Sequence, residues 1–288
     1  MTDRHDAHEA AHHHDDGGDA ALAELLDLDG EMLRQHWTSV LTWVRAAATV
    51  TGRGRILDLG AGTGTGTIGL AQHFAESDIY AVDASEPMLE RIRAKALALG
   101  LTDRIHTVQA NLDDVWPAVD PVDVVWASMS LHHLADPDRV LGDVFTTTRP
   151  GGLVAVVEFS EHLRFLPPDI GLGRPGLEER CLDGLKQEHA DSLPNLGSDW
   201  SPRLEAAGFG VLSERAFAIE LDPPHSPATA RYARAWLRRL MSGLADRLSH
   251  DDLDVLATLV DGDGPQSLSE RDDLQVRGSR TVTLARRP

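Results

Sequence analysis

Residues 56–71, ILDLGAGTGTGTIGLA, decide the fold of this chain. They begin with the apolar run 56–59, which predicts a buried strand. A turn rich in glycine and threonine follows, and residues 68–71 resume at helical spacing. Glycines let a ligand approach the backbone, and the first N–H groups of a helix have no partner within the helix. The stretch therefore predicts a strand–turn–helix unit that binds a polar ligand.

The first ligand that this turn suggests is a dinucleotide. A GxGxxG pattern falls on Gly64, Gly66 and Gly69, and Asp83 lies at a distance downstream that suits a ribose hydroxyl. In a dinucleotide-binding unit, however, the turn glycine follows the strand directly. Here Gly64 comes five residues after Leu59. An NAD-dependent oxidoreductase is therefore the lesser alternative.

A second register does follow the strand directly, namely Asp58-x-Gly60-x-Gly62-x-Gly64. An acidic side chain at this point repels a pyrophosphate, whereas it attracts a ligand with a cationic amino group. This spacing resembles motif I of the class I S-adenosylmethionine-dependent methyltransferases, in which the acid lies near the methionine moiety. The resemblance implies S-adenosyl-L-methionine as the cofactor.

A second signal lies further along the chain. Residues 122–159 read VDVVWASMSLHHLADPDRVLGDVFTTTRPGGLVAVVEF. The near-continuous apolar run 122–127 is typical of a central parallel strand. The whole passage closely resembles the family pattern of a strand, LHHL-D-P, a helix and PGG. It is independent of the glycine turn and supports the same small-molecule type of methyltransferase.

The alternation of apolar strands and amphipathic helices predicts an α/β fold. The expected strands are residues 56–59, 78–83, 104–109, 122–127 and 153–159. The resemblance implies a doubly wound, mostly parallel, seven-stranded Rossmann-like sheet, with the strand 279–285 inserted antiparallel beside the fifth strand. N-terminal helices and a mainly helical cap after the fifth strand complete the predicted architecture.

The chain divides into segments of different expected roles. Residues 1–20 are a disordered tail and residues 21–52 a helical lid, in which Asp29 is the predicted N-cap of a helix over 30–48. Residues 53–160 form the core that binds S-adenosylmethionine. Residues 161–200 and 225–275 form the substrate cap, and residues 201–224 and 276–288 complete the core.

The resemblance also implies which residues contact the cofactor. Asp83, at the end of a predicted strand, is placed to accept hydrogen bonds from both ribose hydroxyls. Met88 is expected against the adenine. Asn111 stands where relatives have an aspartate for the adenine amino group, and a contact near Leu112 or Asp113 is the open alternative. The predicted set is Asp58, Gly60, Ala61, Gly62, Gly64, Asp83, Ala84, Met88, Asn111, Leu112, Ser128 and His133.

The candidate catalytic residues are His132, His133 and Glu158, all expected at the carboxyl edge of the sheet. A histidine there can take a proton from an acceptor hydroxyl or amine during methyl transfer. The alternative for the histidines is a role in the cofactor loop, and for Glu158 that of a structural carboxylate. The candidate acceptor-lining residues are Trp37, Trp43, His162 and Phe165, with core packing as the alternative for the two tryptophans.

Composition and charge limit the partners. The net charge of −19 argues against nucleic acid and anionic membranes, because both would be repelled. Cys181 is the sole cysteine, which excludes an intrachain disulfide. The sequence has no apolar run that could span a bilayer, and its charged, His-rich N-terminus is unlike a signal peptide, so we expect a cytoplasmic monomer or homodimer.

Histidines are concentrated among acidic residues near the N-terminus, between His5 and His14. This composition predicts a solvated tail, and divalent metal binding is the alternative. No fixed spacing specifies a metal site, so none is predicted.

The expected reaction is direct in-line displacement of the methyl group onto a small-molecule acceptor, with oxygen favoured over nitrogen or carbon. A protein that binds S-adenosylmethionine without methyl transfer, such as a cyclase or a regulatory module, is the alternative.

Overall fold

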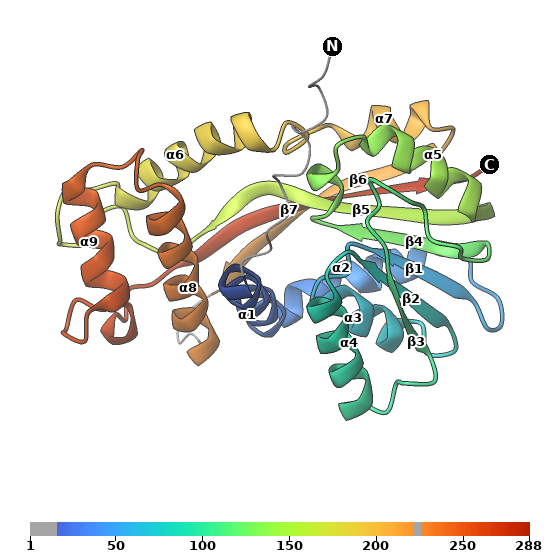
Figure 1. Cartoon of the computed structure of the whole chain (residues 1–288), viewed down its shortest axis with the longest axis horizontal. Coiled ribbons are helices and arrows are strands. Elements are labelled where there is room, and N and C mark those ends of the chain that lie inside the picture. The colour runs from blue at the N-terminus through green and yellow to red at the C-terminus, as the bar shows by residue number, and fades with distance from the viewer. Residues whose placement is uncertain (1–15, 222–225) are drawn as a thin grey trace, which may run out of the picture.

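The computed structural model describes residues 16–221 and 226–288, and its centre is a seven-stranded sheet (Figure 1). The strands are β1 (Arg55–Leu59), β2 (Asp78–Asp83), β3 (Ile105–Gln109), β4 (Val122–Ser128), β5 (Thr148–Arg164), β6 (Gly210–Leu221) and β7 (Val276–Arg286). Their order is β3-β2-β1-β4-β5-β7-β6. The first five pair in parallel, and β7 runs antiparallel between β5 and β6. The predicted doubly wound sheet and its antiparallel last strand are confirmed.

Helices cover both faces of the sheet. The helices are α1 (Asp16–Met32), α2 (Arg34–Ala47), α3 (Thr65–His73), α4 (Glu86–Ala98), α5 (Pro137–Thr147), α6 (Leu177–Ser192), α7 (Trp200–Ala206), α8 (Pro227–Gly243) and α9 (His250–Asp261). Side chains of α2, α3 and α4 pack in one hydrophobic core, and those of α5 and α7 pack in a second core on the opposite face (Figure 1). Alternate residues of β1 and β4 enter the two cores, as the two-residue period of a strand requires.

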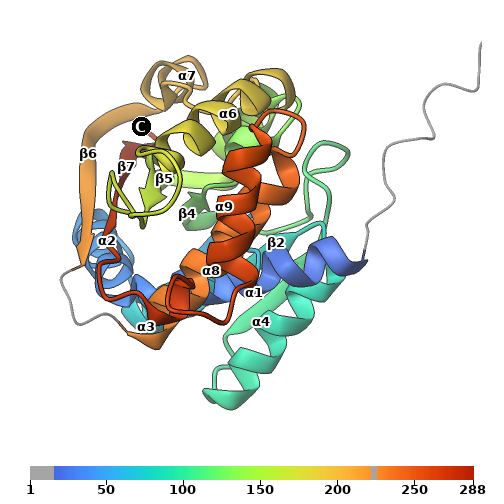
Figure 2. The same cartoon turned by 90° about the vertical axis from the view of Figure 1, so that its left-hand side faces the viewer.

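A helical cap stands beyond the sheet (Figure 2). Its helices α6, α8 and α9 share a separate core that includes Cys181, Leu240 and Leu256. Helix α1 packs against α8 and also reaches α3 (Figure 1). The cap and the N-terminal helix therefore meet on the side of the sheet where the parallel strands end.

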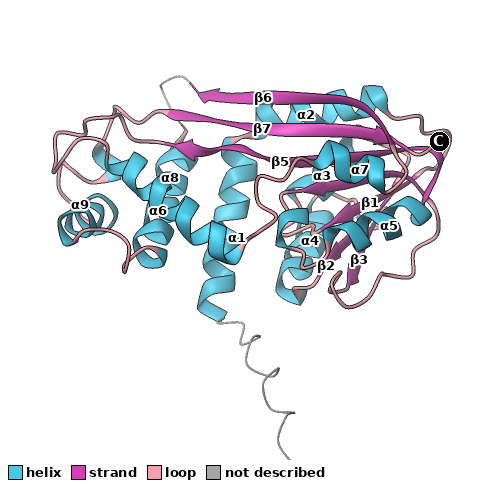
Figure 3. Cartoon of the chain, turned by 90° about the horizontal axis from the view of Figure 1, so that it is seen from above, coloured by secondary structure: helices cyan, strands magenta, loops and turns pink. Residues whose placement is uncertain are grey.

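Strand β5 is much longer than the strand 153–159 that the sequence predicts. It pairs with β7 from Leu153↔Arg286 to Arg164↔Arg277, with two irregularities after Phe159. Figure 3 shows β5, β6 and β7 continuing from the sheet toward the cap. Polar and apolar residues alternate only loosely after Phe159, so the local pattern does not predict this extension. The extension forms by pairing with β7, which is distant in the sequence.

The predicted N-cap role of Asp29 is wrong. Helix α1 runs through Asp29 and Gly30 to Met32, and a single residue, Leu33, separates it from α2. The side chain of Asp29 is buried and accepts hydrogen bonds from Trp37 on α2 and from Arg280 on β7. Helix α1 begins at Asp16, within the predicted tail, and residues 1–15 lie outside the described part of the chain.

Candidate cofactor and acceptor site

The glycine turn after β1 has a left-handed backbone. Gly60, Gly62 and Gly64 have φ values of 66°, 52° and 89°. A Cβ atom on Gly60 would lie 2.4 Å from the Cβ of Ser130, a separation that real side chains do not adopt. The Ser130 hydroxyl donates to the carbonyl oxygen of Leu59 at 2.7 Å. The loop after β4 is thus held directly against the turn, and only glycine fits between them.

Two carboxylates flank this turn. The Oδ2 atom of Asp58 is buried and accepts a hydrogen bond from the Thr67 hydroxyl at 2.6 Å. Asp83 accepts from the backbone N–H of Gly62 at 2.8 Å and from that of Ser85 at 2.9 Å. Adjacent parallel strands therefore bring an acid from β1 and an acid from β2 to the same edge of the sheet.

Burial sets the protonation of both acids. Burial raises the pKa of Asp58 to about 7, the hydrogen bond from Thr67 lowers it, and the nearby charge of Asp83 raises it. Burial also raises the pKa of Asp83, against the backbone N–H groups that lower it. A cationic ligand would stabilise the ionised form of both acids.

This arrangement fits the predicted cofactor. Asp58 suits the ammonium group of S-adenosylmethionine. The space that a Cβ would take at Gly60 and Gly62 is occupied by Ser130 and Leu26, so these glycines let the loop after β4 and helix α1 pack against the turn. Each carboxylate oxygen has two lone pairs, so Asp83 retains acceptor capacity for ribose hydroxyls despite its backbone partners. A pyrophosphate in the same place would meet two acids, which is unfavourable.

The predicted adenine end is less clearly arranged. Met88 on α4 and Leu112 after β3 are both buried. The amide of Asn111, by contrast, is used inside its own turn. Its Nδ2 donates to Asp114 at 2.7 Å, and its Oδ1 accepts from the N–H of Asp113 at 3.2 Å. The role of Asn111 toward adenine therefore stays a prediction, with Leu112 and its neighbours as the open alternative.

A histidine–carboxylate pair lies just beyond the end of β4, between His132 and Glu158 of the neighbouring strand β5. Nδ1 of His132 lies 2.6 Å from Oε2 of Glu158, and both side chains are less than a tenth exposed. The other oxygen, Oε1 of Glu158, is buried without a hydrogen-bond partner in the described part of the chain. The predicted catalytic residues His132 and Glu158 are therefore in contact.

Other histidines surround this pair. The His133 ring lies 4.2 Å from that of His132, and His162 lies between Phe159 at 5.2 Å and His189 at 5.8 Å, measured between ring centroids. Burial lowers the pKa of His133 and that of His162 to about 4, and the other histidines contribute to both shifts. These two rings are uncharged at neutral pH, so they offer a neutral, aromatic wall for an acceptor.

The remaining predicted acceptor residues occupy different places. Trp37 is buried, and its indole N–H donates to Asp29 at 2.9 Å. Trp43 packs on Phe217 of β6 at 5.5 Å between ring centroids. Phe165 is fully buried, with its ring 5.4 Å from that of Tyr232. Of these four residues, His162 is the one that lies in the histidine cluster, which consists of His132, His133, His162 and His189.

Ser128 and Ala84 follow the same edge of the sheet. Ser128 ends β4, and Ala84 follows β2 directly. Ala61 lies in the glycine turn, where its N–H donates to the carbonyl oxygen of Val82 at 2.9 Å. These positions lie along the ends of three neighbouring strands, β1, β2 and β4, and their contacts with the cofactor stay predictions.

Helix α1 covers the glycine turn. The Leu26 side chain lies 3.1 Å from where a Cβ on Gly62 would be. Asp27 pairs with Lys95 of α4 at 2.6 Å, and Lys95 also donates to the carbonyl oxygen of Thr63 at 2.7 Å. The segment predicted as a lid therefore lies over the turn, and Lys95 of α4 links the two by an ion pair to α1 and a hydrogen bond to the turn.

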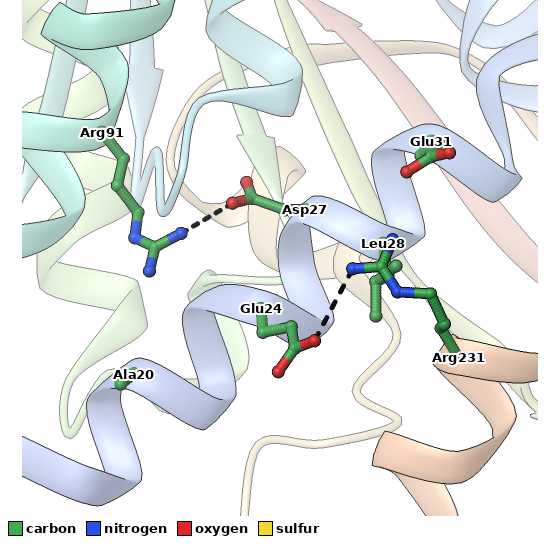
Figure 4. A pocket seen from close by; sticks show the side chains of 7 residues that line it. All are labelled: Ala20, Glu24, Asp27, Leu28, Glu31, Arg91 and Arg231. Carbon is green, nitrogen blue, oxygen red and sulfur yellow. Dashed lines mark hydrogen bonds and ion pairs between the residues drawn. The ribbon is translucent and has the colours of Figure 1, made fainter. Parts of the chain in front are cut away.

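A cavity of about 350 Å³ lies between α1, α4 and α8 (Figure 4). Four of its charged lining residues form two ion pairs. Arg91 bonds to Asp27 at 2.8 Å, and Arg231 lies 3.7 Å from Glu24. The lining includes neither the acids of the glycine turn nor the histidines, so this cavity is not the predicted site.

Sequence reasoning missed Thr67, Ser130, Asp29 and Arg280 as members of this region. Thr67 and Ser130 act through hydrogen bonds to the ends of β1, which no local pattern reveals. Within residues 16–221 and 226–288, no three His, Cys, Asp or Glu side chains gather as a metal site. The histidines between positions 5 and 14 lie outside those ranges. No helix in the same ranges has the length and apolar character needed to cross a membrane.

Comparisons with known proteins give consistent results. A family model described as "Methyltransferase domain" matches residues 56–152. A demethylmenaquinone methyltransferase from Clavibacter sepedonicus is 38% identical over 196 residues, which are 63% of this chain and 74% of that protein. A ubiquinone/menaquinone biosynthesis C-methyltransferase from Vibrio vulnificus is 33% identical over 37% of this chain. For this and other relatives, the chain matches less than half of the relative's length.

A solved structure shows the same fold. A protein from Bacillus halodurans, described as a candidate methyltransferase, aligns with a TM-score of 0.55 at 18% identity. The alignment covers 87% of this chain and 99% of the other. At this identity the similarity concerns the fold alone.

Proposed function

We propose that this chain, which belongs to the class I S-adenosylmethionine-dependent methyltransferases, methylates a small molecule at the carboxyl edge of its sheet. S-adenosylmethionine is the cofactor of the family, and when bound it supplies a methyl group that its sulfonium charge already activates. The observation that carries the proposal is the buried contact between His132 and Glu158, near the glycine turn that Asp58 and Asp83 flank.

The chain's own residues have separate tasks in this proposal. Asp58 binds the ammonium group, and Asp83 binds the ribose hydroxyls. Gly60 and Gly62 bring the backbone close to the cofactor, and Met88 packs near the adenine. These contacts orient the donor so that an acceptor can attack in line, which is the largest contribution that the protein can make to such a reaction.

His132 is the proposed general base. When the neutral ring donates its Nδ1 proton to Glu158, its Nε2 atom carries the free lone pair. That atom takes the proton from an acceptor hydroxyl, and the resulting anion is the nucleophile. The Glu158 carboxylate then stabilises the protonated ring. His133 is a poorer base, because burial lowers its pKa to about 4.

The atom that receives the methyl group has two candidates. Oxygen is the direct candidate, because deprotonation of a hydroxyl leaves the charge there. Carbon is the second, favoured by a similar protein that is named a C-methyltransferase. In a hydroxyarene, one deprotonation serves both outcomes, since the charge is shared between the oxygen and ring carbons.

Transfer of labelled methyl groups tests the proposal. The protein is incubated with S-adenosylmethionine labelled in its methyl group and a panel of hydroxyarenes, including a naphthohydroquinone. We expect labelled product together with S-adenosylhomocysteine, and NMR spectroscopy then shows whether oxygen or carbon is methylated. Tight cofactor binding without transfer to any acceptor would instead favour the cyclase or regulatory alternative.

We expect Asp83→Ala to weaken the binding of S-adenosylmethionine by about 1–3 kcal/mol, because its hydrogen bonds to the ribose hydroxyls are lost. Isothermal titration calorimetry measures the change. The matched control is Asp103→Ala, since Asp103 is exposed between α4 and β3. Unchanged affinity in Asp83→Ala would mean that another carboxylate binds the ribose.

We expect the affinity for S-adenosylmethionine to fall as the pH is lowered from 7.5 to 5.5, by up to about tenfold per unit. The pKa of Asp58 is raised to about 7, so the acid becomes protonated over this range, whereas the ammonium group of the ligand requires its ionised form. Calorimetry at three pH values measures the slope. Asp58→Asn should remove it, and an equal slope in that variant would contradict the assignment.

A further inference from the structure

Arg280 is a buried arginine on β7, directly opposite Phe159 of β5. Its side chain is only 2% exposed. It lies on the face of the sheet that α1 and α2 cover, where it contacts Asp29 and Trp37. A buried guanidinium is costly unless charge and hydrogen bonds compensate it, so its surroundings indicate its role.

The guanidinium is held in a fixed orientation. Its Nη2 donates to Oδ1 of Asp29 at 2.6 Å, and Oδ2 of Asp29 accepts the indole N–H of Trp37 at 2.9 Å. The guanidinium carbon lies 4.8 Å from the centroid of the Trp37 ring and 5.5 Å from that of Phe159. Cation–π contacts and one carboxylate therefore fix its plane.

The hydrogen-bonding capacity of Arg280 exceeds these contacts. A guanidinium has five N–H donors in a planar fork that suits a carboxylate. Within the described residues, Nη1 faces the Sδ atom of Met129 at 2.8 Å. A thioether is a weak acceptor, and the methionine side chain is flexible. Nη1 is therefore the edge of the guanidinium at which a better acceptor would be preferred.

Met129 also places this edge beside the reaction site. It follows β4 directly, three residues before His132, and its φ of 52° is unusual for a residue other than glycine. The positive charge of Arg280 also contributes to the lowered pKa of His162 in the histidine cluster. The guanidinium thus lies between helices α1 and α2 on one side and the neutral histidine rings on the other.

We propose that Arg280 binds a carboxylate of the methyl acceptor, which displaces the Met129 thioether from Nη1. The inference rests on the proposed function and narrows its substrate to an acid that also carries the hydroxyl facing His132. Asp29 already balances the charge of the guanidinium, and the acceptor carboxylate would lie near the cationic donor. The rings of His133 and His162 are uncharged, and Arg239, whose charge also acts on His133, is exposed on α8, so Arg280 is the buried cation beside these rings.

The alternative is a purely structural pair that ties α1 to β7. The two roles differ in what they predict for ligand charge. A structural pair does not distinguish an anionic acceptor from a neutral one of the same shape. An anchor for a carboxylate binds the anionic acceptor more tightly than the neutral one. Replacing Arg280 then abolishes this preference without affecting the binding of S-adenosylhomocysteine.

Matched probes test the inference. The protein is saturated with S-adenosylhomocysteine, and the binding of naphthoate is compared with that of its neutral isostere naphthamide by calorimetry. We expect roughly tenfold or greater preference for naphthoate, since a hydrogen bond to a charged group is involved. Arg280→Met should remove the preference, and Arg280→Lys should retain part of it.

Two further variants show whether a loss of preference comes from a misfolded protein rather than from the loss of Arg280. Asp29→Asn combined with Arg280→Met removes both charges together, so that no unpaired acid stays buried. Arg215→Met is the matched control, because Arg215 lies over Phe217 at 4.5 Å but is exposed on β6. Every variant should bind S-adenosylhomocysteine within about threefold of the wild type, which shows that the fold is intact.

Three results would overturn the inference. They are no binding of naphthoate by the wild type, equal binding of naphthoate and naphthamide by the wild type, and a preference for naphthoate that persists in both Arg280→Met variants. Failure of the wild type to bind S-adenosylhomocysteine is a different result, because it contradicts the proposed function itself. The two failures are therefore distinguished in one set of titrations.

Discussion

Replacing Gly60 by alanine is expected to weaken the binding of S-adenosylmethionine by about two orders of magnitude. The φ of 66° disfavours a side chain, and the new Cβ would lie 2.4 Å from the Cβ of Ser130. Ser130 cannot retreat freely, since its hydroxyl bonds to Leu59 at 2.7 Å. Either the glycine turn or the loop after β4 must move, and both contribute to the cofactor site.

Gly52→Ala is the matched control for this variant. Gly52 has a similar φ of 62°, but a Cβ there would meet nothing within 4 Å. It should lower the free energy of unfolding by about 1 kcal/mol and leave cofactor binding unchanged. Calorimetry and thermal unfolding of both variants separate backbone strain from the clash. Binding by Gly60→Ala within threefold of the wild type would contradict the placement of the turn.

Replacing His132 by alanine is expected to lower kcat about 10²–10⁴-fold and to leave the affinity for S-adenosylhomocysteine nearly unchanged. The reason is that the proposed base is lost while the glycine turn is untouched. Glu158→Gln should lower kcat less, because the amide keeps a hydrogen bond to the ring but loses the charge. Steady-state kinetics with an acceptor found in the labelling experiment measures both effects.

His106→Ala is the control for the loss of a histidine, because His106 lies on β3 beside Asp78 and away from the carboxyl edge. It should keep its activity. If His132→Ala retained more than a tenth of the wild-type kcat, the protein would act by alignment alone. Glu158 and His132 would then be a structural pair.

The sequence predicts the parts of this protein that depend on local pattern. Strand β2 has the predicted bounds of 78–83, because apolar residues and flanking turn residues define it without reference to the rest of the chain. The turn with Asp58, Gly60 and Gly62 was predicted for the same reason. Asp83 was placed beside it because the carboxyl ends of parallel strands meet at one edge of the sheet.

The features that sequence reasoning missed depend on distant partners. Asp29 looked like a helix cap, yet it pairs with Arg280, which lies 251 residues further along the chain. The extension of β5 beyond Phe159 likewise requires β7 as its partner. No local periodicity contains this information, since each pairing forms only when the cap and the last strand close over the sheet.

The measurement that tests the central claim most directly is a calorimetric titration of the purified protein with S-adenosylmethionine, S-adenosylhomocysteine and NADH. We expect micromolar binding of the first two, weakened by Asp83→Ala, and no binding of NADH. Binding of NADH, or no binding of either S-adenosyl compound, would contradict the assignment of the glycine turn as the cofactor site.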